Sequence, residues 1–141
     1  MKRPLLAFAC LSLALFGAGC ASTQSNLAPG TDLSELQTFY VQKLPADNRG
    51  VERLISDRLN TMGKESTYGD GENPPEPVDA KVTYQDRWTW DITMYMIQLD
   101  VQIRDGESNR VLASAQSRRP SMQRRSPEGM VEEVLDEIFS Q

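Results

Sequence analysis

Residues 78–104 read VDAKVTYQDRWTWDITMYMIQLDVQIR, and this stretch decides the fold. Apolar side chains recur at every second position over residues 78–90, and the alternation starts again over residues 95–103. A period of two places neighbouring side chains on opposite faces of a strand, so each segment predicts a strand with one apolar face. An Asp-Gly turn at residues 105–106 precedes a third apolar alternation at residues 111–115. The stretch therefore predicts a three-stranded antiparallel meander.

Two segments outside the meander have the spacing of amphipathic helices. Residues 51–62 carry one apolar stripe, and residues 127–139 carry another, with Ser126 placed to cap the second helix and proline at its first position. Residues 38–44 are rich in β-branched and aromatic residues, which predicts a further strand. The expected order is β-α-β-β-β-α. It predicts an α+β fold, a two-layer sandwich in which a four-stranded, mostly antiparallel sheet carries both helices on one face.

Several local features depend on single residues. Either Asp47 or Asn48 is suited to cap the first helix, and Glu52 is expected on the solvent face of that helix. Residues 64–77 contain two glycines and three prolines, which predicts a surface loop. Asp86 interrupts the apolar face of its strand. Such a carboxylate indicates a bulge or a paired group more readily than a catalytic acid or base.

The N-terminal twenty residues have the layout of a bacterial lipoprotein signal. Two basic residues precede an apolar run over residues 5–18, which has the length of a secretory signal and is short for a membrane-spanning helix. Small residues at 17–19 lead directly to Cys20. The segment resembles a lipobox, although Gly17 stands where that pattern favours leucine. The resemblance implies that the Cys20 thiol is acylated, which labelled palmitate would reveal. An ordinary secretory leader or a retained membrane helix is the alternative.

The same resemblance implies a domain organisation and a location. Residues 1–19 are expected to be removed as a signal peptide, and residues 20–36, which are small and polar, predict a lipid-anchored flexible tether. Residues 37–141 are expected to form a single α+β periplasmic domain. Because Ala21 and not aspartate follows the cysteine, we expect the periplasmic face of the outer membrane of a Gram-negative cell. The N-terminal acyl chains on Cys20 would hold the protein there.

Composition excludes several classes of function. The chain has no histidine, which removes Ser-His-Asp and Cys-His catalytic pairs and His-ligated metal sites. The sequence has no glycine-rich phosphate loop and no cysteine metal cluster. It carries 15 basic and 20 acidic residues, and removing two basic residues and no acid with the leader leaves a net charge of −7, which argues against nucleic-acid binding. We therefore expect a protein that is not an enzyme and that holds neither a cofactor nor a metal.

A group of four arginines is the first candidate for binding. All four lie within eight residues of an acidic chain, and the guanidinium group suits phosphates and carboxylates. The group predicts a loop that binds lipid phosphates or an acidic envelope partner. The alternative is a solvated loop that pairs with nearby acids such as Glu128 and Glu132. The four residues are Arg118, Arg119, Arg124 and Arg125.

The second candidate is apolar. Met94 and Met96 fall on the polar positions of their strand, and beside a tryptophan they predict an exposed patch for contact with a partner or a membrane. Trp88 and Trp90 are expected to be core residues beneath a helix. The alternative is that Trp90 lies beside the two methionines and joins the exposed patch at one end of the sheet.

Several of these features together resemble small proteobacterial outer-membrane lipoproteins, most of which have uncharacterised function. The resemblance is carried by the Cys20 region, by Trp-Asp-Ile-Thr-Met-Tyr at residues 90–95 and by Arg-Arg-Ser-Pro-Glu-Gly-Met-Val at residues 124–131. The order of elements is also similar to the lipopolysaccharide-assembly lipoprotein that plugs a transport barrel and to auxiliary lipoproteins of lipid-transporting ABC systems. The resemblance implies a lipid-anchored, non-enzymatic binding or accessory module for another envelope component. The alternative is a lipid- or lipopolysaccharide-binding auxiliary subunit of an envelope transport system, which needs an apolar groove between helices and sheet.

Overall fold

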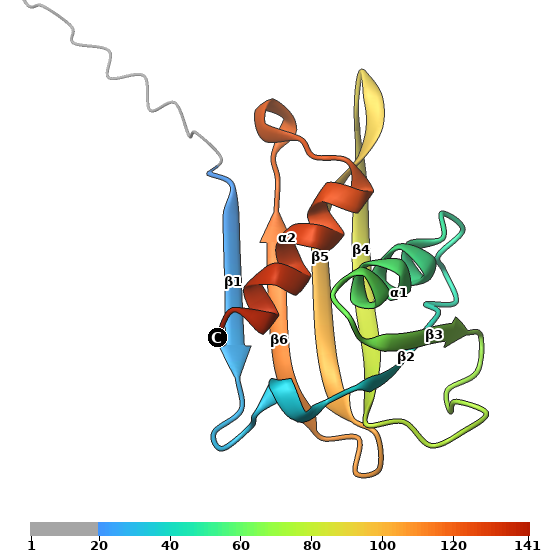
Figure 1. The fold of residues 1–141 in the computed structure, drawn as a ribbon. Coiled ribbons are helices and arrows are strands. Elements are labelled where there is room, and N and C mark those ends of the chain that lie inside the picture. The colour runs from blue at the N-terminus through green and yellow to red at the C-terminus, as the bar shows by residue number, and fades with distance from the viewer. Residues whose placement is uncertain (1–19) are drawn as a thin grey trace, which may run out of the picture.

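A six-stranded sheet organises the computed structural model, which describes residues 20–141. The strands lie in the order β1-β6-β5-β4-β2-β3, and two α-helices pack against them (Figure 1). The predicted signal peptide, residues 1–19, lies outside the described residues. The strands are β1 (Ser22–Leu27), β2 (Thr38–Gln42), β3 (Glu65–Gly69), β4 (Ala80–Asp91), β5 (Thr93–Asp105) and β6 (Val111–Arg118), and the helices are α1 (Val51–Thr61) and α2 (Pro127–Phe139).

The predicted four-stranded, mostly antiparallel sheet is wrong, because the sheet has six strands and is mixed. β4, β5 and β6 form the predicted antiparallel meander. β2 is the predicted additional strand, and it runs parallel to both of its neighbours. The two strands that the sequence pattern did not indicate, β1 and β3, form the two edges of the sheet.

β1 lies within residues 20–36, the segment whose composition predicts a flexible tether. It pairs antiparallel with β6 along its whole length. Its Thr23 hydroxyl donates to the carboxylate of Glu133 on α2. Its Ser25 hydroxyl donates to Glu137, also on α2, at 3.0 Å. Backbone pairing and hydroxyl–carboxylate hydrogen bonds hold this strand, and it buries little apolar surface, so no apolar periodicity marks it.

β3 forms one of the two parallel pairings of the sheet, and β2 with β4 forms the other. α1 separates β2 from β3 and returns the chain to the start of β2, so that Thr38 lies beside Glu65. A helical crossover is the usual connection between adjacent parallel strands. β3 falls within residues 64–77, for which the glycine and proline content predicts a loop. Its side chains are mostly exposed, and a short exposed edge strand has no alternation to reveal it.

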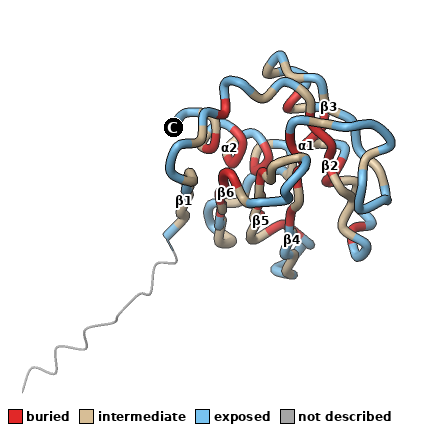
Figure 2. Tube along the Cα trace, turned by 90° about the horizontal axis from the view of Figure 1, so that it is seen from below, coloured by how far each residue is buried: buried red, intermediate tan, exposed pale blue. Residues whose placement is uncertain are grey.

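Both helices cover the same face of the sheet, as predicted, and the core lies between the two layers (Figure 2). Burying each Leu- or Phe-sized side chain there contributes about 1.5–3 kcal/mol. The opposite face of the meander carries the polar half of each alternation. The fully buried residues include Val41, Val82, Leu99, Val101 and Ile103 from strands and Val51, Ile55, Leu59, Val134, Leu135 and Ile138 from helices.

The start of each helix follows from local hydrogen bonds. Ser126 caps α2, because its hydroxyl accepts the N–H of Gly129 at 3.1 Å, as predicted. At α1, Asp47 and not Asn48 satisfies the first N–H groups: its carboxylate accepts the N–H of Val51 at 2.8 Å. The prediction that Glu52 faces solvent is wrong, because this side chain is buried. The loop before α1 folds back over the first turn and brings Asp47 beside it.

Candidate functional site

Three segments that are far apart in the sequence lie at one end of the molecule (Figure 1). Cys20 is exposed and stands two residues before β1. The backbone N–H of Ala21 donates to Gln123 Oε1 at 3.0 Å, which joins this segment to the loop between β6 and α2. The tip of the β4–β5 hairpin lies beside that loop. We call this part of the molecule, which comprises Cys20, Ala21 and residues 88–96 and 119–126, the Cys20 end.

The tip of the β4–β5 hairpin is apolar and exposed. Trp90, Ile92 and Met94 are 68%, 84% and 47% exposed, and Met122 in the neighbouring loop is 95% exposed. Trp90 is therefore not the core residue that its position in the alternation predicts. The hairpin extends past the first turn of α2, so no helix covers its tip (Figure 1).

A bulge explains why Met96 does not join this patch. The strand register shifts between Arg87 and Trp88, so that Trp88 pairs with Met96 and Ile97 is the extra residue on β5. One extra residue reverses the alternation between its two sides, so Met96, before Ile97, shares a face with Leu99, after it. Met96, predicted to be exposed, is consequently only 1% exposed and packs in the core.

The backbone at the hairpin tip is strained. Ile92 has a φ of 64°, in the left-handed region that β-branched residues rarely adopt. That conformation costs a residue other than glycine about 1–2 kcal/mol. The chain thus keeps an exposed isoleucine where glycine would remove both the strain and the apolar surface.

Arg124 braces the tip. Its guanidinium donates to Thr93 Oγ1 at 2.8 Å and to the carbonyl oxygen of Asp91 at 2.5 Å, and it lies 4.2 Å from the ring centroid of Tyr95. The hydroxyl of Ser121 also donates to the Asp91 carboxylate. The β6–α2 loop and the hairpin tip are therefore held together as one surface.

The other three arginines of the predicted cluster do not converge with Arg124. Arg119 is half-buried and pairs with Glu133 through two hydrogen bonds. Burial favours the neutral form of the Glu133 carboxyl, but hydrogen bonds from Arg119 and from hydroxyls on β1 and β6 outweigh it, so the pKa of Glu133 lies below its ordinary value. Arg125 Nε lies 3.9 Å from Glu133 Oε2, and Arg118 is exposed at the end of β6. The acids that neutralise the loop are Glu133 and Asp91, not the predicted Glu128 and Glu132.

A buried polar network that the sequence did not indicate lies between α1 and the sheet. The Tyr84 hydroxyl donates to Asp47 Oδ2 at 2.7 Å and accepts the N–H of Leu44 at 3.2 Å. Burial and the adjacent Asp47 carboxylate raise the pKa of Tyr84 far above its ordinary value. Burial, with Asp47 adding to it, also raises the pKa of Glu52. Burial alone would raise the pKa of Asp47, but four hydrogen bonds together outweigh it, so the pKa lies below its ordinary value. The network holds the loop before α1 against β4.

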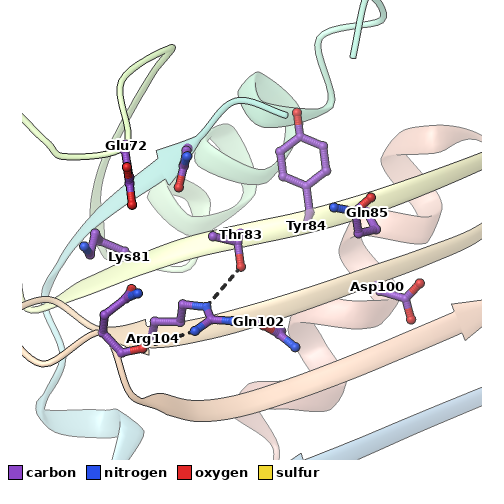
Figure 3. Close-up of a pocket in the computed structure, with 10 residues that line it drawn as sticks. Glu72, Lys81, Thr83, Tyr84, Gln85, Asp100, Gln102 and Arg104 are labelled. Carbon is purple, nitrogen blue, oxygen red and sulfur yellow. Dashed lines mark hydrogen bonds between the residues drawn. The ribbon is translucent and has the colours of Figure 1, made fainter. Parts of the chain in front are cut away.

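The open face of the sheet carries a shallow polar depression of about 400 Å³ (Figure 3). Arg104 crosses its floor and donates to Gln102 Oε1 at 2.6 Å and to Thr83 Oγ1 at 3.4 Å. Lys81 and Asp100 lie on either side. Arg104, Gln102 and Thr83 therefore bind one another across neighbouring strands of the sheet.

Asp86 is paired and lies next to the bulge, which agrees with the prediction of a bulge or a paired carboxylate at this position. The indole Nε1–H of Trp88 donates to Asp86 Oδ2 at 2.6 Å. Within residues 20–141, no three or more acidic, cysteine or histidine side chains are grouped to hold a metal ion. Over the same range, no helix has both the length and the apolar character needed to cross a membrane.

No family model matches the sequence, and no curated relative matches it. Two solved structures of PelC from Paraburkholderia phytofirmans, both dodecamers, are similar in fold. A PelC variant with one leucine-to-methionine substitution has a TM-score of 0.61 at 12% identity, covering 82% of this chain and 96% of that chain. The other PelC dodecamer has a TM-score of 0.59 at 12% identity, covering 86% of this chain and 100% of that chain. At this identity the likeness concerns the fold alone.

Proposed function

We propose that this chain is a non-enzymatic envelope protein, anchored by acyl chains on Cys20 to the periplasmic face of the outer membrane, that binds another envelope component. The observation that carries the proposal is the placement of Cys20. It is exposed and leads into β1 after one intervening residue, and the hydrogen bond from Ala21 to Gln123 fixes its position relative to the sheet. Acyl chains on this residue would hold the whole domain close to the lipid surface.

Metabolic labelling tests the anchor. Cells that produce the full chain are grown with labelled palmitate, and the protein is recovered from separated membranes. We expect label and membrane association for the native chain and for Cys10→Ala, and loss of both for Cys20→Ala. Membrane association of Cys20→Ala, together with a native chain that carries no label, would contradict the proposal.

We propose further that one component this protein binds is a second copy of itself. The support is that PelC, whose whole chain shares this fold, was solved as a dodecamer. The exposed edge strands β1 and β3 offer unpaired backbone groups for contact between copies. Native mass spectrometry of the purified full chain, released from detergent, measures the assembly directly. A series of discrete multimers is the expected result, and a monomer at every concentration would contradict it.

A further inference from the structure

The most exposed large apolar side chains of the described residues are concentrated in one place. Five such side chains are exposed, and all but Tyr68 on β3 lie at the Cys20 end. A folded protein seldom groups exposed apolar side chains unless the patch meets a partner or a membrane. The four residues at the Cys20 end are Trp90, Ile92, Met94 and Met122.

The strand register places this apolar tip beyond Cys20. Ser22 lies opposite Arg118, and Arg118 lies opposite Gln98, so these residues stand at one level across the sheet. Counted from that level toward the Cys20 end, Cys20 lies two residues beyond Ser22, and Ile92 lies six residues beyond Gln98 along β5. At about 3.3 Å per residue, and allowing for the bulge, the tip stands roughly 10 Å farther out than Cys20. Apolar groups of interfacial helices are buried to a similar depth, about 5–10 Å into the boundary between headgroups and acyl chains.

The charged side chains are also distributed unevenly between the Cys20 end and the opposite end of the molecule. Arg125 at the Cys20 end is exposed, and so is Arg118, which immediately precedes that end on β6; the one carboxylate at the hairpin tip, Asp91, is paired with Arg124. The opposite end of the molecule holds the loop before β4 and the β5–β6 turn, which lie together because Gly106 N–H donates to the carbonyl of Asp79 (Figure 1). Such an arrangement turns the basic end toward an anionic lipid surface. The acids of that opposite end include Asp70, Glu72, Glu76, Asp105 and Glu107.

We infer that the Cys20 end is a membrane-seating surface. The hairpin tip and Met122 insert into the interfacial layer of a phospholipid bilayer, and the exposed Arg118 and Arg125 contact lipid phosphates. Tryptophan suits this layer because its ring is apolar and its N–H finds polar partners. An apolar surrounding also removes the cost of exposing Ile92 to water. The inference rests on the proposed anchoring through Cys20 and adds a fixed orientation of the domain on the bilayer.

Depth-dependent quenching of tryptophan fluorescence tests the inference. The chain has two tryptophans, so Trp88→Phe leaves Trp90 as the only reporter and Trp90→Phe leaves Trp88 as the matched control. Each full chain, made in cells with its leader, is reconstituted into vesicles of phosphatidylethanolamine and phosphatidylglycerol that carry brominated acyl chains. We expect Trp90 to lose most of its emission and to shift to shorter wavelength, whereas Trp88, packed under Arg49 at 4.1 Å, keeps its emission.

The mass of each reconstituted protein separates the two proposals. If Cys20 carries acyl chains and Trp90 is not quenched, the seating surface is wrong while the anchor stands. If Cys20 is unmodified, the proposed anchoring fails, and quenching of Trp90 on the same vesicles then decides the seating surface by itself. Equal quenching of Trp88 and Trp90 would also overturn the inference, because it would indicate an unfolded or unoriented chain.

A second pair of variants keeps the test independent of folding defects. Ile92→Asn removes the apolar side chain and is compatible with the left-handed backbone, so the fold is retained. In the Trp88→Phe background we expect Ile92→Asn to reduce the quenching of Trp90 severalfold, and Tyr68→Ser, which removes an exposed aromatic ring on β3, to leave it unchanged. Unchanged quenching in Ile92→Asn would contradict insertion of the tip.

Discussion

Glu133 on α2 is bonded to two strands and to the loop that follows β6. Its carboxylate accepts hydrogen bonds from Thr23 on β1, from Ser117 on β6 and from Arg119 after β6. It therefore ties α2 to the edge strand that follows Cys20. Because the site is largely buried, these charge-assisted bonds are worth more than a surface ion pair.

Replacing Glu133 tests this role. Glu133→Gln keeps the shape but leaves the Arg119 guanidinium without its counter-charge, and we expect the free energy of unfolding to fall by about 2 kcal/mol. Glu132→Gln on the same helix is the control, since Glu132 forms only a surface pair with Arg58 at 3.6 Å, and it should change stability by less than about 0.5 kcal/mol. Urea denaturation measures both. Equal effects of the two substitutions would show that Glu133 is no more than a surface charge.

The start of α1 depends on a carboxylate three residues before the helix N-cap. Asp47 accepts the N–H groups of Arg49 and Val51, while Gly50, with a φ of 75°, makes the turn into the helix. Losing such a cap costs about 1–2 kcal/mol. We expect Asp47→Ala to destabilise the protein by at least that amount, because Tyr84 also loses its acceptor. Asn48→Ala, at the exposed neighbouring position, should have almost no effect in the same thermal or urea unfolding measurement, and the reverse ranking would contradict this capping.

The edge strand β1 can be distinguished from a flexible tether by hydrogen exchange. Its pairing with β6 predicts that alternate amides of Ser22–Leu27 exchange far more slowly than an unstructured peptide. Mass spectrometry of peptides covering this segment is the measurement, with the exposed loop at residues 70–77 as the fast-exchanging reference. Complete exchange of Ser22–Leu27 at the earliest time point would show that the strand is not stably paired.

The elements that the sequence predicted correctly are those with an apolar period. The stripes of α1 and α2 and the alternation of the meander each bury a continuous face, and such faces leave a pattern of spacing. β1 and β3 lie at the sheet edges and are held by backbone pairing, so spacing could not reveal them. The reversal at Ile97 could not be predicted either, because a bulge depends on the partner strand, and it moved Met96 from the candidate patch into the core. Alternation identified the hairpin that carries Trp90 and Met94, but it placed Trp90 in the core, because it could not show that the hairpin tip extends beyond the helices.

At the scale of the whole molecule, carboxylates decide how stability depends on pH. Among the residues that the structure describes, five carboxylates have a lowered pKa. Each favours the folded state above its ordinary pKa, and that contribution is lost as pH falls through the lowered value. The pKa of Glu52 is raised, so its ionisation works in the opposite direction and reduces stability as pH rises through its folded value. The five carboxylates with a lowered pKa are Asp32, Asp47, Asp79, Asp105 and Glu133.

We expect the free energy of unfolding to decline as the pH falls from about 5 to about 3. In Glu133→Gln the decline should be shallower, because one of the contributing groups no longer titrates. In Glu52→Gln the stability near neutral pH should increase, because a buried charge has been removed. Urea denaturation at several pH values measures all three proteins. A pH profile that is flat for the native chain would contradict the lowered pKa values.

β5 spans most of the molecule. With Cys20 anchored in lipid at one end of the sheet, the length of β5 would set the distance between the membrane and the other end. Its 13 residues cover about 40 Å at about 3.3 Å per residue. On a bilayer, the β5–β6 turn would therefore lie at a fixed distance from the lipid surface, whereas a flexible tether would allow a range of distances. Any partner that binds the far end of this molecule would then have to extend to that distance from the membrane. Residues inserted between Cys20 and β1 would make the distance variable.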